Sequence, residues 1–381
     1  MPSPKEPISL YFHVPFCTHK CGYCHFYVLP NRQDLKNIFM QALAKEWSLR
    51  LPDLMDKEIV SIYFGGGTPS LLGVEYLGEI IEWIKRDVNF DPLTTEITLE
   101  ANPETITFSL MQAYALAGVN RVSIGIQTLS NTLLEKLERQ HSAEKAIEAV
   151  WASYEAGLKN LTVDLMYDLP NQTLAIWKET LLQVSKLPIK HLSLYNLTIE
   201  PHTTFFKYRD LLLKTLPDPD LSLQMYELAQ AMLNSCDLKQ YEISAFAQEG
   251  FQSKHNTGYW AGRSFLGLGP SAFSYWKGKR FRNIAHLNRY AYLLNNGNFP
   301  LDFEEQLDPE ASQRELLAIR LRMREGIDLK TFQQAHGALS QETLQNLTCL
   351  EEQGFINKES SRISLSQQGV LFYDTVATEL I

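Results

Sequence analysis

Short apolar runs alternate with longer amphipathic segments over residues 1–245 of the chain. The apolar runs are rich in β-branched and aromatic residues and predict strands, at residues 8–14, 59–64, 96–101, 121–126, 161–165 and 191–195. The amphipathic segments predict helices, at residues 35–50, 74–87, 131–138, 143–156, 173–186 and 219–235. Alternating strands and helices are typical of a parallel sheet covered by helices. We therefore expect an α/β fold in which six βα units form a partial (β/α)6 relative of the (β/α)8 barrel.

The pattern changes after residue 245. Residues 246–305 mix glycine, aromatic residues and arginine, and we expect this connecting segment to wrap the mouth of the barrel. Residues 306–381 then show three helical patterns, in RELLAIRLRM, LKTFQQA and SQETLQNLTCLEEQG, and a hairpin pattern in FINKESSRISLSQQG. This order predicts a small C-terminal winged-helix-like domain.

Charge narrows the classes of partner. The chain has 35 Lys and Arg against 44 Asp and Glu, a net charge of −9. Nucleic-acid binding needs a surplus of basic residues on one face, so we expect no nucleic-acid partner. No apolar run approaches the length of a membrane span, and the amino terminus lacks the pattern of a secretory signal. We therefore expect a cytoplasmic protein that is not an integral membrane protein.

Three of the five cysteines stand close together in FCTHKCGYCHF, directly after the first predicted strand. The spacing Cys17-x3-Cys21-x2-Cys24 offers three thiolates, which can hold three irons of a cubane cluster and leave the fourth iron open. A structural zinc site normally needs four protein ligands, and no second CxxC pair or nearby histidine pair supplies the fourth. His25 could coordinate, but a residue adjacent to a ligand usually points away, so zinc is the weaker alternative. We expect Cys236 and Cys349 to be small buried residues in helices.

Polar residues gather where the predicted strands end. They are Tyr11 and His13, the run Gly65-Gly66-Gly67-Thr68, Glu100 and Asn102, Gln127, and Asp164. Each alone reads as a turn or a hydrogen-bonded polar residue. Their repetition at the same end of five strands favours a ligand site, because the working face of such barrels lies at the carboxyl ends of the strands. The three glycines lack the lysine of a phosphate loop and expose backbone groups that can bind an ammonium group.

The cysteine run resembles the signature of the radical S-adenosylmethionine (SAM) superfamily. The flanking sequences YFHVPFC and GGGTPS are similar to those of its HemN/HemW branch, which contains anaerobic coproporphyrinogen III oxidases and haem chaperones. The resemblance implies a [4Fe-4S] cluster on Cys17, Cys21 and Cys24, with SAM at the open iron. It also implies SAM contacts at Tyr11, Gly66, Gly67, Thr68, Glu100, Gln127, Arg139 and Asp164. Whether one or two SAM molecules bind stays open.

A second motif, HNTGYW at residues 255–260, resembles the HNxxYW motif of the HemW haem chaperones, which the oxidases do not carry. A lone histidine among aromatic residues is more often a packed one. The resemblance implies haem as a cofactor, with His255 as a candidate ligand of the haem iron and Tyr259 and Trp260 as flat faces for the porphyrin. Basic residues follow that could pair with propionates or form a solvated loop, at Lys277, Lys279, Arg280 and Arg282.

Phe26 separates the two subfamilies. The oxidases of this branch have a fourth cysteine at this position, whereas HemW-type proteins have phenylalanine, as this chain does. The chain departs from the usual HemW pattern at His25, where aspartate is common, and at Glu138 and Asp168, where glycine is common. The last two departures put the local loop geometry in question, and His25 has no evident role.

The resemblance implies a haem chaperone that binds haem and transfers it to acceptor haemoproteins, with those of the respiratory chain as candidates. The cluster and SAM would then serve assembly, regulation of transfer or formation of a homodimer. One alternative is an enzyme, oxygen-independent coproporphyrinogen III oxidase, which decarboxylates propionate side chains by radical chemistry. Another is a radical reaction on an unrelated substrate, with HNTGYW as a structural motif. The acceptor, the mode of haem attachment and the oligomeric state stay open.

Overall fold

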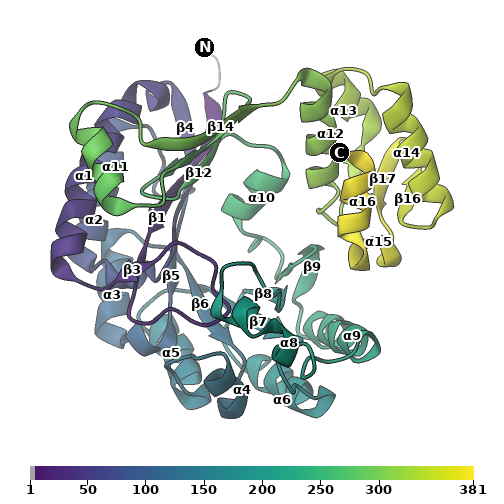
Figure 1. Ribbon diagram of the computed structural model, residues 1–381, viewed down its shortest axis with the longest axis horizontal. Coiled ribbons are helices and arrows are strands. Elements are labelled where there is room, and N and C mark those ends of the chain that lie inside the picture. The colour runs from purple at the N-terminus through teal and green to yellow at the C-terminus, as the bar shows by residue number, and fades with distance from the viewer. Residues whose placement is uncertain (1–4) are drawn as a thin grey trace.

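A curved sheet of 12 strands forms the centre of the computed structural model, which describes residues 5–381 (Figure 1). Six parallel strands follow one another in chain order: β1 (Glu6–Val14), β4 (Lys57–Gly66), β5 (Glu96–Ala101), β6 (Arg121–Gln127), β7 (Asn160–Tyr167) and β8 (His191–Asn196). All six predicted strands are present. The partial (β/α)6 barrel is therefore confirmed.

Helices cover the outer face of this sheet (Figure 1). They are α1 (Gln33–Leu54), α2 (Val74–Asp87), α3 (Phe108–Ala117), α4 (Asn131–Lys136), α5 (Ala143–Glu155), α6 (Leu174–Val184) and α9 (Pro219–Ser235). The sequence predicted all of them except α3. Its residues FSLMQAYALA are largely apolar all round, so no amphipathic stripe marks it as a helix.

The two faces of the strands differ in polarity. On β1 the fully buried side chains Ile8, Leu10 and Phe12 pack against the helices, while Tyr11 and His13 face the barrel interior. The same alternation continues around the sheet, because successive side chains of a strand point to opposite faces. Its inward residues include Ser61 and Tyr63, Glu96, Thr98 and Glu100, Arg121 and Ser123, Thr162 and Asp164, and His191 and Ser193. These side chains form what we call the polar lumen.

Residues after β8 extend the sheet at both edges. At one edge β10 (Ala245–Ala247) and β9 (Lys239–Glu242) follow β8. At the other edge β11 (Phe265–Leu268) pairs in parallel with β1 and is followed by β12 (Phe273–Trp276), β13 (Lys279–Asn283) and β14 (Leu301–Gln306). Helix α11 (Leu287–Asn295) packs against α1.

Helix α10 (Lys254–Trp260) closes the amino end of the lumen. The carboxylate of Glu96, the first residue of β5, accepts hydrogen bonds from the backbone nitrogens of Lys254 (3.0 Å) and His255 (3.1 Å). Residues 246–305 therefore do not form one wrap around the mouth of the barrel. Their strands extend the sheet and α10 closes the opposite end, while the Leu287 nitrogen at the start of α11 donates to the Tyr27 hydroxyl beside the cysteine loop (2.9 Å).

The C-terminal domain contains the expected three helices and hairpin. These are α12 (Pro309–Arg320), α13 (Leu329–His336) and α14 (Gln341–Glu352), with β15 (Ile327–Asp328), β16 (Ile356–Glu359) and β17 (Arg362–Leu365) in one small sheet. Two short helices, α15 (Gln367–Leu371) and α16 (Tyr373–Leu380), follow and were not predicted. Throughout residues 5–381, no helix has both the length and the apolar character needed to cross a membrane.

The expected burial of the two isolated cysteines was wrong. Cys236 follows the last residue of α9 and is partly exposed, and Cys349 lies on an exposed position of α14. Cys349 falls outside the apolar stripe of α14, and Cys236 lies just beyond the end of α9.

Candidate functional site

The cysteine loop begins at β2 (Phe16–Cys17) and lies directly on the glycine turn that follows β4. The Gly67 nitrogen donates to the Val14 oxygen (2.9 Å), and the Thr68 nitrogen donates to the Phe16 oxygen (2.7 Å). A Cβ atom at Gly67 would lie 2.8 Å from the Phe16 oxygen, too close for any other residue. Gly66 has a φ of 110°, which also favours glycine. The turn therefore supports the loop as well as exposing backbone groups.

The three thiols belong to one polar environment. Cys17 Sγ lies 3.5 Å from Thr68 Oγ1, and Arg139 Nη1 lies 3.7 Å from Cys21 Sγ. Burial raises the pKa of Cys17 to about 11, and the charges of Cys24 and Cys21 contribute to the rise. Among residues 5–381, no three histidine, cysteine or acidic side chains are grouped closely enough for a single metal ion.

This donor set fits a [4Fe-4S] cluster. Thiolates are the ligands that iron–sulfur clusters prefer, and three of them here share one loop. The guanidinium of Arg139 beside Cys21 offsets part of the negative charge that the ligating thiolates would carry. Arg139 itself is held in place, since its Nη2 donates to Asn102 Oδ1 (2.8 Å) and to the Gly125 oxygen (2.7 Å).

Two carboxyl groups lie in the lumen below the loop. Glu100 accepts hydrogen bonds from the Tyr63 hydroxyl (2.6 Å) and the Gly66 nitrogen (3.3 Å), and Asp164 accepts from the Ser123 hydroxyl (3.1 Å). Burial raises the pKa of Glu100 to about 7, and the charge of Asp164 adds to this rise. Burial also raises the pKa of Asp164. A ligand with hydroxyl groups or a positive charge would complete the hydrogen bonding of this pair.

The candidate SAM residues form one connected region. Asn102 links two of them, because its Nδ2 donates to Thr68 Oγ1 (2.9 Å) and its Oδ1 accepts from Arg139. The Tyr11 hydroxyl lies 3.0 Å from His13 Nδ1, and Gln127 is buried at the end of β6 with a φ of 62°. The structure thus gathers the residues that the sequence singled out, namely Tyr11, Gly66, Gly67, Thr68, Glu100, Gln127, Arg139 and Asp164. Tyr63 and Ser123 were not predicted as site residues, although the two-residue alternation along β4 and β6 places both on the lumen face.

The HNTGYW motif lies on α10, and its histidine is enclosed. His255 is 1% exposed, with Nδ1 2.9 Å from Ser61 Oγ and Nε2 2.6 Å from the Tyr259 hydroxyl. Burial lowers the pKa of His255 to about 3, so the ring is neutral. Both ring nitrogens are occupied within the fold. Haem iron therefore does not fit on His255 in this arrangement, and ligation there would require α10 to move away from Ser61.

The other motif residues lie nearer to the surface. Trp260 lines two cavities, and Arg322 lies over its ring, 4.2 Å from the centroid. The Trp260 Nε1 atom is buried without a hydrogen-bond partner. The basic residues of β12 to β13 are paired with carboxylates, in the pairs Lys277–Asp53, Lys279–Glu304, Arg280–Glu305, Arg280–Glu315 and Arg282–Asp302. These side chains are thus engaged in ion pairs, and Lys277, Lys279 and Arg282 remain exposed to solvent, as a solvated basic loop would be.

The departures from the usual family pattern coincide with unusual backbone. Glu138 has a φ of 57° and Asp168 a φ of 60°, the left-handed region that favours glycine. Glycine, the usual family residue at both positions, adopts this φ without strain. The loop therefore keeps the shape that glycine would allow, and the backbone at Glu138 and Asp168 is strained. The ring of His25 stacks near that of Phe26, with centroids 4.6 Å apart, and Phe26 is half exposed.

Comparisons with known proteins agree with these features. Residues 11–184 match the family model described as the radical SAM superfamily, and residues 307–372 match that of the HemN C-terminal domain. The chain is 31% identical over 369 residues to a protein of Bacillus subtilis named heme chaperone HemW, covering 97% of each chain. It is 34% identical over 380 residues to the protein of the same name in Haemophilus influenzae, covering 96% of each.

A solved structure shares the fold. The radical SAM enzyme coproporphyrinogen III oxidase (HemN) from Escherichia coli matches with a TM-score of 0.87, covering 99% of this chain and 90% of the other. The sequence identity is 22%, so this likeness speaks for the fold alone.

Proposed function

Because the chain belongs to the HemW family of radical SAM proteins, we propose that it is a haem chaperone, which binds haem and transfers it to acceptor haemoproteins. The relationship over nearly the whole length to proteins named heme chaperone HemW carries this proposal. Phe26, at the position where the related oxidases have a fourth cysteine, supports it. The proposed setting is the cytoplasm, the proposed acceptors include respiratory haemoproteins, and a homodimer is the proposed assembly.

The cysteine loop would hold the cluster. Cys17, Cys21 and Cys24 are the proposed ligands of a [4Fe-4S] cluster, with SAM at the open iron. When bound and reduced, such a cluster can cleave SAM to a 5′-deoxyadenosyl radical. The surrounding residues orient the ligand: Arg139 suits its carboxylate, and the carboxyl groups of Glu100 and Asp164 suit ribose hydroxyls or an amine.

The remaining candidate residues complete the SAM site. The backbone at Gly66 and Gly67 can approach a ligand closely because neither residue has a side chain. Thr68 hydrogen-bonds to both Asn102 and Cys17, so it connects the cluster loop to β5. Tyr11 and Gln127 line the same region. With a pKa of about 7, Glu100 can accept hydrogen bonds as a carboxylate near neutral pH or donate one as an acid.

The haem site is proposed at α10. Tyr259 and Trp260 on this helix offer aromatic faces, and Trp260 lines two cavities beside the C-terminal domain. His255 remains the proposed iron ligand only for a state in which α10 has withdrawn from the lumen. Such a movement would displace only a short helix, because α10 is seven residues long and two backbone nitrogens at its amino end are bound by Glu96.

A paired assay tests the proposal. The cluster is reconstituted anaerobically, SAM and reductant are added, and both haem titration by Soret absorbance and coproporphyrinogen decarboxylation are measured. We expect stoichiometric haem binding, transfer to a haem-free b-type cytochrome and no decarboxylation. Sustained decarboxylation would overturn the chaperone and establish the oxidase. The variant His255→Ala tests the iron ligand separately from the chaperone function. An unchanged Soret band in this variant would exclude His255 as the iron ligand and leave the proposed haem binding in place.

A further inference from the structure

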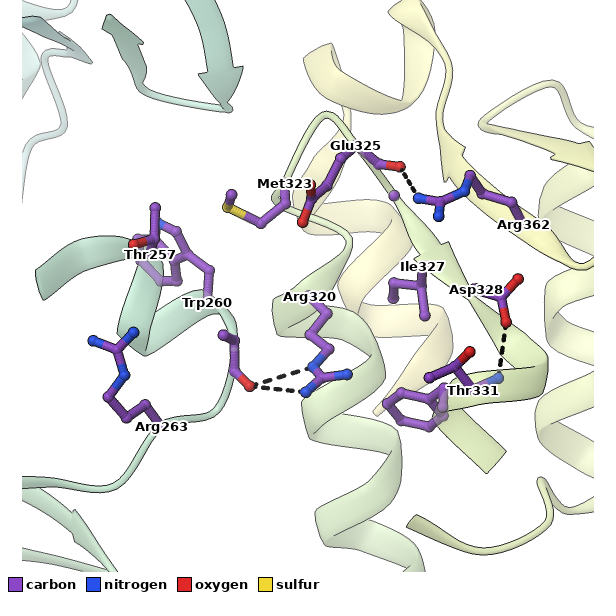
Figure 2. Close-up of a pocket in the computed structure, with 13 residues that line it drawn as sticks. Thr257, Trp260, Arg263, Arg320, Met323, Glu325, Ile327, Asp328, Thr331 and Arg362 are labelled. Carbon is purple, nitrogen blue, oxygen red and sulfur yellow. Dashed lines mark hydrogen bonds between the residues drawn. The ribbon is translucent and has the colours of Figure 1, made fainter. Parts of the chain in front are cut away.

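A cavity of about 520 Å³ lies between α10 and the C-terminal domain. Figure 2 shows the two sides facing each other, with Thr257 and Trp260 on α10 and Arg320, Met323 and Ile327 on the opposite side. Its volume falls within the range of about 300–1,000 Å³ typical of small-molecule and cofactor sites. The residues Trp260 and Thr257 belong to the HNTGYW motif, so the cavity adjoins the proposed haem helix.

The charged side chains that line this cavity have a net positive charge. Arg263, Arg320 and Arg362 contribute three positive charges against the two carboxylates Glu325 and Asp328. The Asp328 carboxylate is already bound, since it accepts from the Thr331 nitrogen (2.8 Å) and the Ser361 hydroxyl (2.5 Å). Such a basic lining is notable in a chain with a net charge of −9 and indicates an anionic ligand.

The arginines retain unused donors. Arg320 reaches across from α12, and its Nε and Nη2 donate to the Ala261 oxygen at 3.3 and 3.1 Å (Figure 2). Arg362 Nη1 donates to the backbone carbonyl oxygen of Glu325 (2.7 Å). A guanidinium has five N–H donors in a planar fork that matches a carboxylate. These bonds therefore hold the two arginines in position and leave donors for a ligand.

We propose that this cavity binds the porphyrin of haem through its carboxylates, with Arg320 and Arg362 as their partners and Trp260 and Met323 as apolar contacts. This inference rests on the proposed function and adds the site: the C-terminal domain supplies the carboxylate-binding residues. Porphyrin binding here does not depend on iron ligation by His255, which lies enclosed on the lumen side of α10. A flat ligand with two carboxylates needs an apolar surface and cationic partners, and this cavity is lined by both kinds of side chain.

Metal-free protoporphyrin IX and its dimethyl ester are the probes, because they isolate the carboxylates from the iron. Binding to the reconstituted full-length protein is followed by porphyrin fluorescence. The variants are Arg320→Gln, Arg362→Gln and their combination. The matched control is Arg289→Gln, which removes the same charge from an exposed position of α11.

We expect each single variant to weaken binding of the free acid about ten-fold, as loss of one charge-assisted contact implies. The double variant should weaken it further, the ester should bind the parent at least ten-fold more weakly than the acid, and the control should match the parent. Equal binding of acid and ester by the parent would overturn the inference, and this comparison needs no variant. An unchanged double variant would overturn it as well.

Failure of the proposed carboxylate site can be told apart from failure of the proposed chaperone function. If the parent gives a stoichiometric Soret band with haem while acid and ester bind alike, the chaperone stands and only this site is wrong. If the parent binds no haem at all, the proposed function itself fails. Thermal unfolding of each variant verifies that lost binding does not reflect a lost fold.

Discussion

The ring of His255 stacks on the ring of Tyr63, with centroids 4.8 Å apart. Tyr63 in turn donates its hydroxyl hydrogen to Glu100 in the candidate SAM region. The HNTGYW motif and the polar lumen are therefore parts of one packed core. A substitution on α10 is therefore expected to affect the surroundings of Glu100 through Tyr63 as well as any haem site.

Replacing one ligand cysteine should abolish the cluster. In Cys21→Ser, we expect loss of the broad iron–sulfur absorbance and of most bound iron, because a hydroxyl is a poor ligand for these irons. Anaerobic reconstitution followed by absorbance and iron analysis measures this. Cys349→Ser is the control, since that thiol is exposed on α14. Full iron content in Cys21→Ser would contradict the assigned ligand set.

Glu100→Gln should change the pH dependence of stability. The folded state keeps the Glu100 proton up to a pKa of about 7, above the usual value of 4.5, so the parent loses stability as pH rises from 4.5 to 7. We expect this loss to amount to about 2 kcal/mol, allowing for water in the lumen, and to be absent in the variant. Denaturant unfolding at several pH values measures the difference.

The exposed residue Glu155 provides the matched control for this series, because it ends α5 at the surface. Glu155→Gln should follow the parent at every pH. If Glu100→Gln showed the same slope as the parent between pH 4.5 and 7, the carboxyl group would not be the one that titrates.

His255→Asn should also change the pH dependence of stability, but in the acid range, where the parent loses stability as pH falls. The pKa of His255 is lowered to about 3, so between pH 6.5 and 3 the unfolded chain takes up a proton that the folded chain refuses. The parent therefore loses stability as pH falls through this window, by up to about 5 kcal/mol more than the variant. At pH 7 the variant should be about 1–3 kcal/mol less stable, because buried hydrogen bonds to Ser61 and Tyr259 are lost.

Here the control is His202→Asn, at an exposed position with a φ of 64° that asparagine tolerates. It should leave both the stability at pH 7 and the acid slope unchanged. Identical acid slopes for the parent and His255→Asn would mean that the imidazole is accessible to protons and not enclosed.

Glu138→Gly should stabilise the protein. Glu138 has a φ of 57°, a conformation that costs a non-glycine residue roughly 1 kcal/mol, while the greater freedom of glycine in the unfolded chain offsets part of the gain. We expect a net increase of up to about 1 kcal/mol in the free energy of unfolding. In Glu135→Gly, within α4, the same change should instead destabilise by about 1 kcal/mol. Equal effects at the two positions would argue against strain at Glu138.

Local sequence patterns were enough to predict the six parallel strands and most of the helices, and they placed the three proposed cluster ligands on one loop. Strand and helix patterns depend on neighbours within a few residues, and Cys17, Cys21 and Cys24 lie on one short loop, so their proximity needs no tertiary information. Polar residues at the strand ends also predicted part of the lumen lining, because the carboxyl ends of six parallel strands meet at the same end of the barrel. Helix α3 escaped prediction because its apolar residues form no stripe.

Only the tertiary structure decided what His255 and the arginines can do. His255 meets Ser61 across 194 residues of chain, and that contact turned an apparent haem ligand into an enclosed ring. Arg320 and Arg362 line a cavity shared with α10 only because the C-terminal domain packs beside that helix. Contacts between distant segments depend on how whole elements pack, which no local spacing records, and burial then sets whether a side chain binds a ligand or supports the fold.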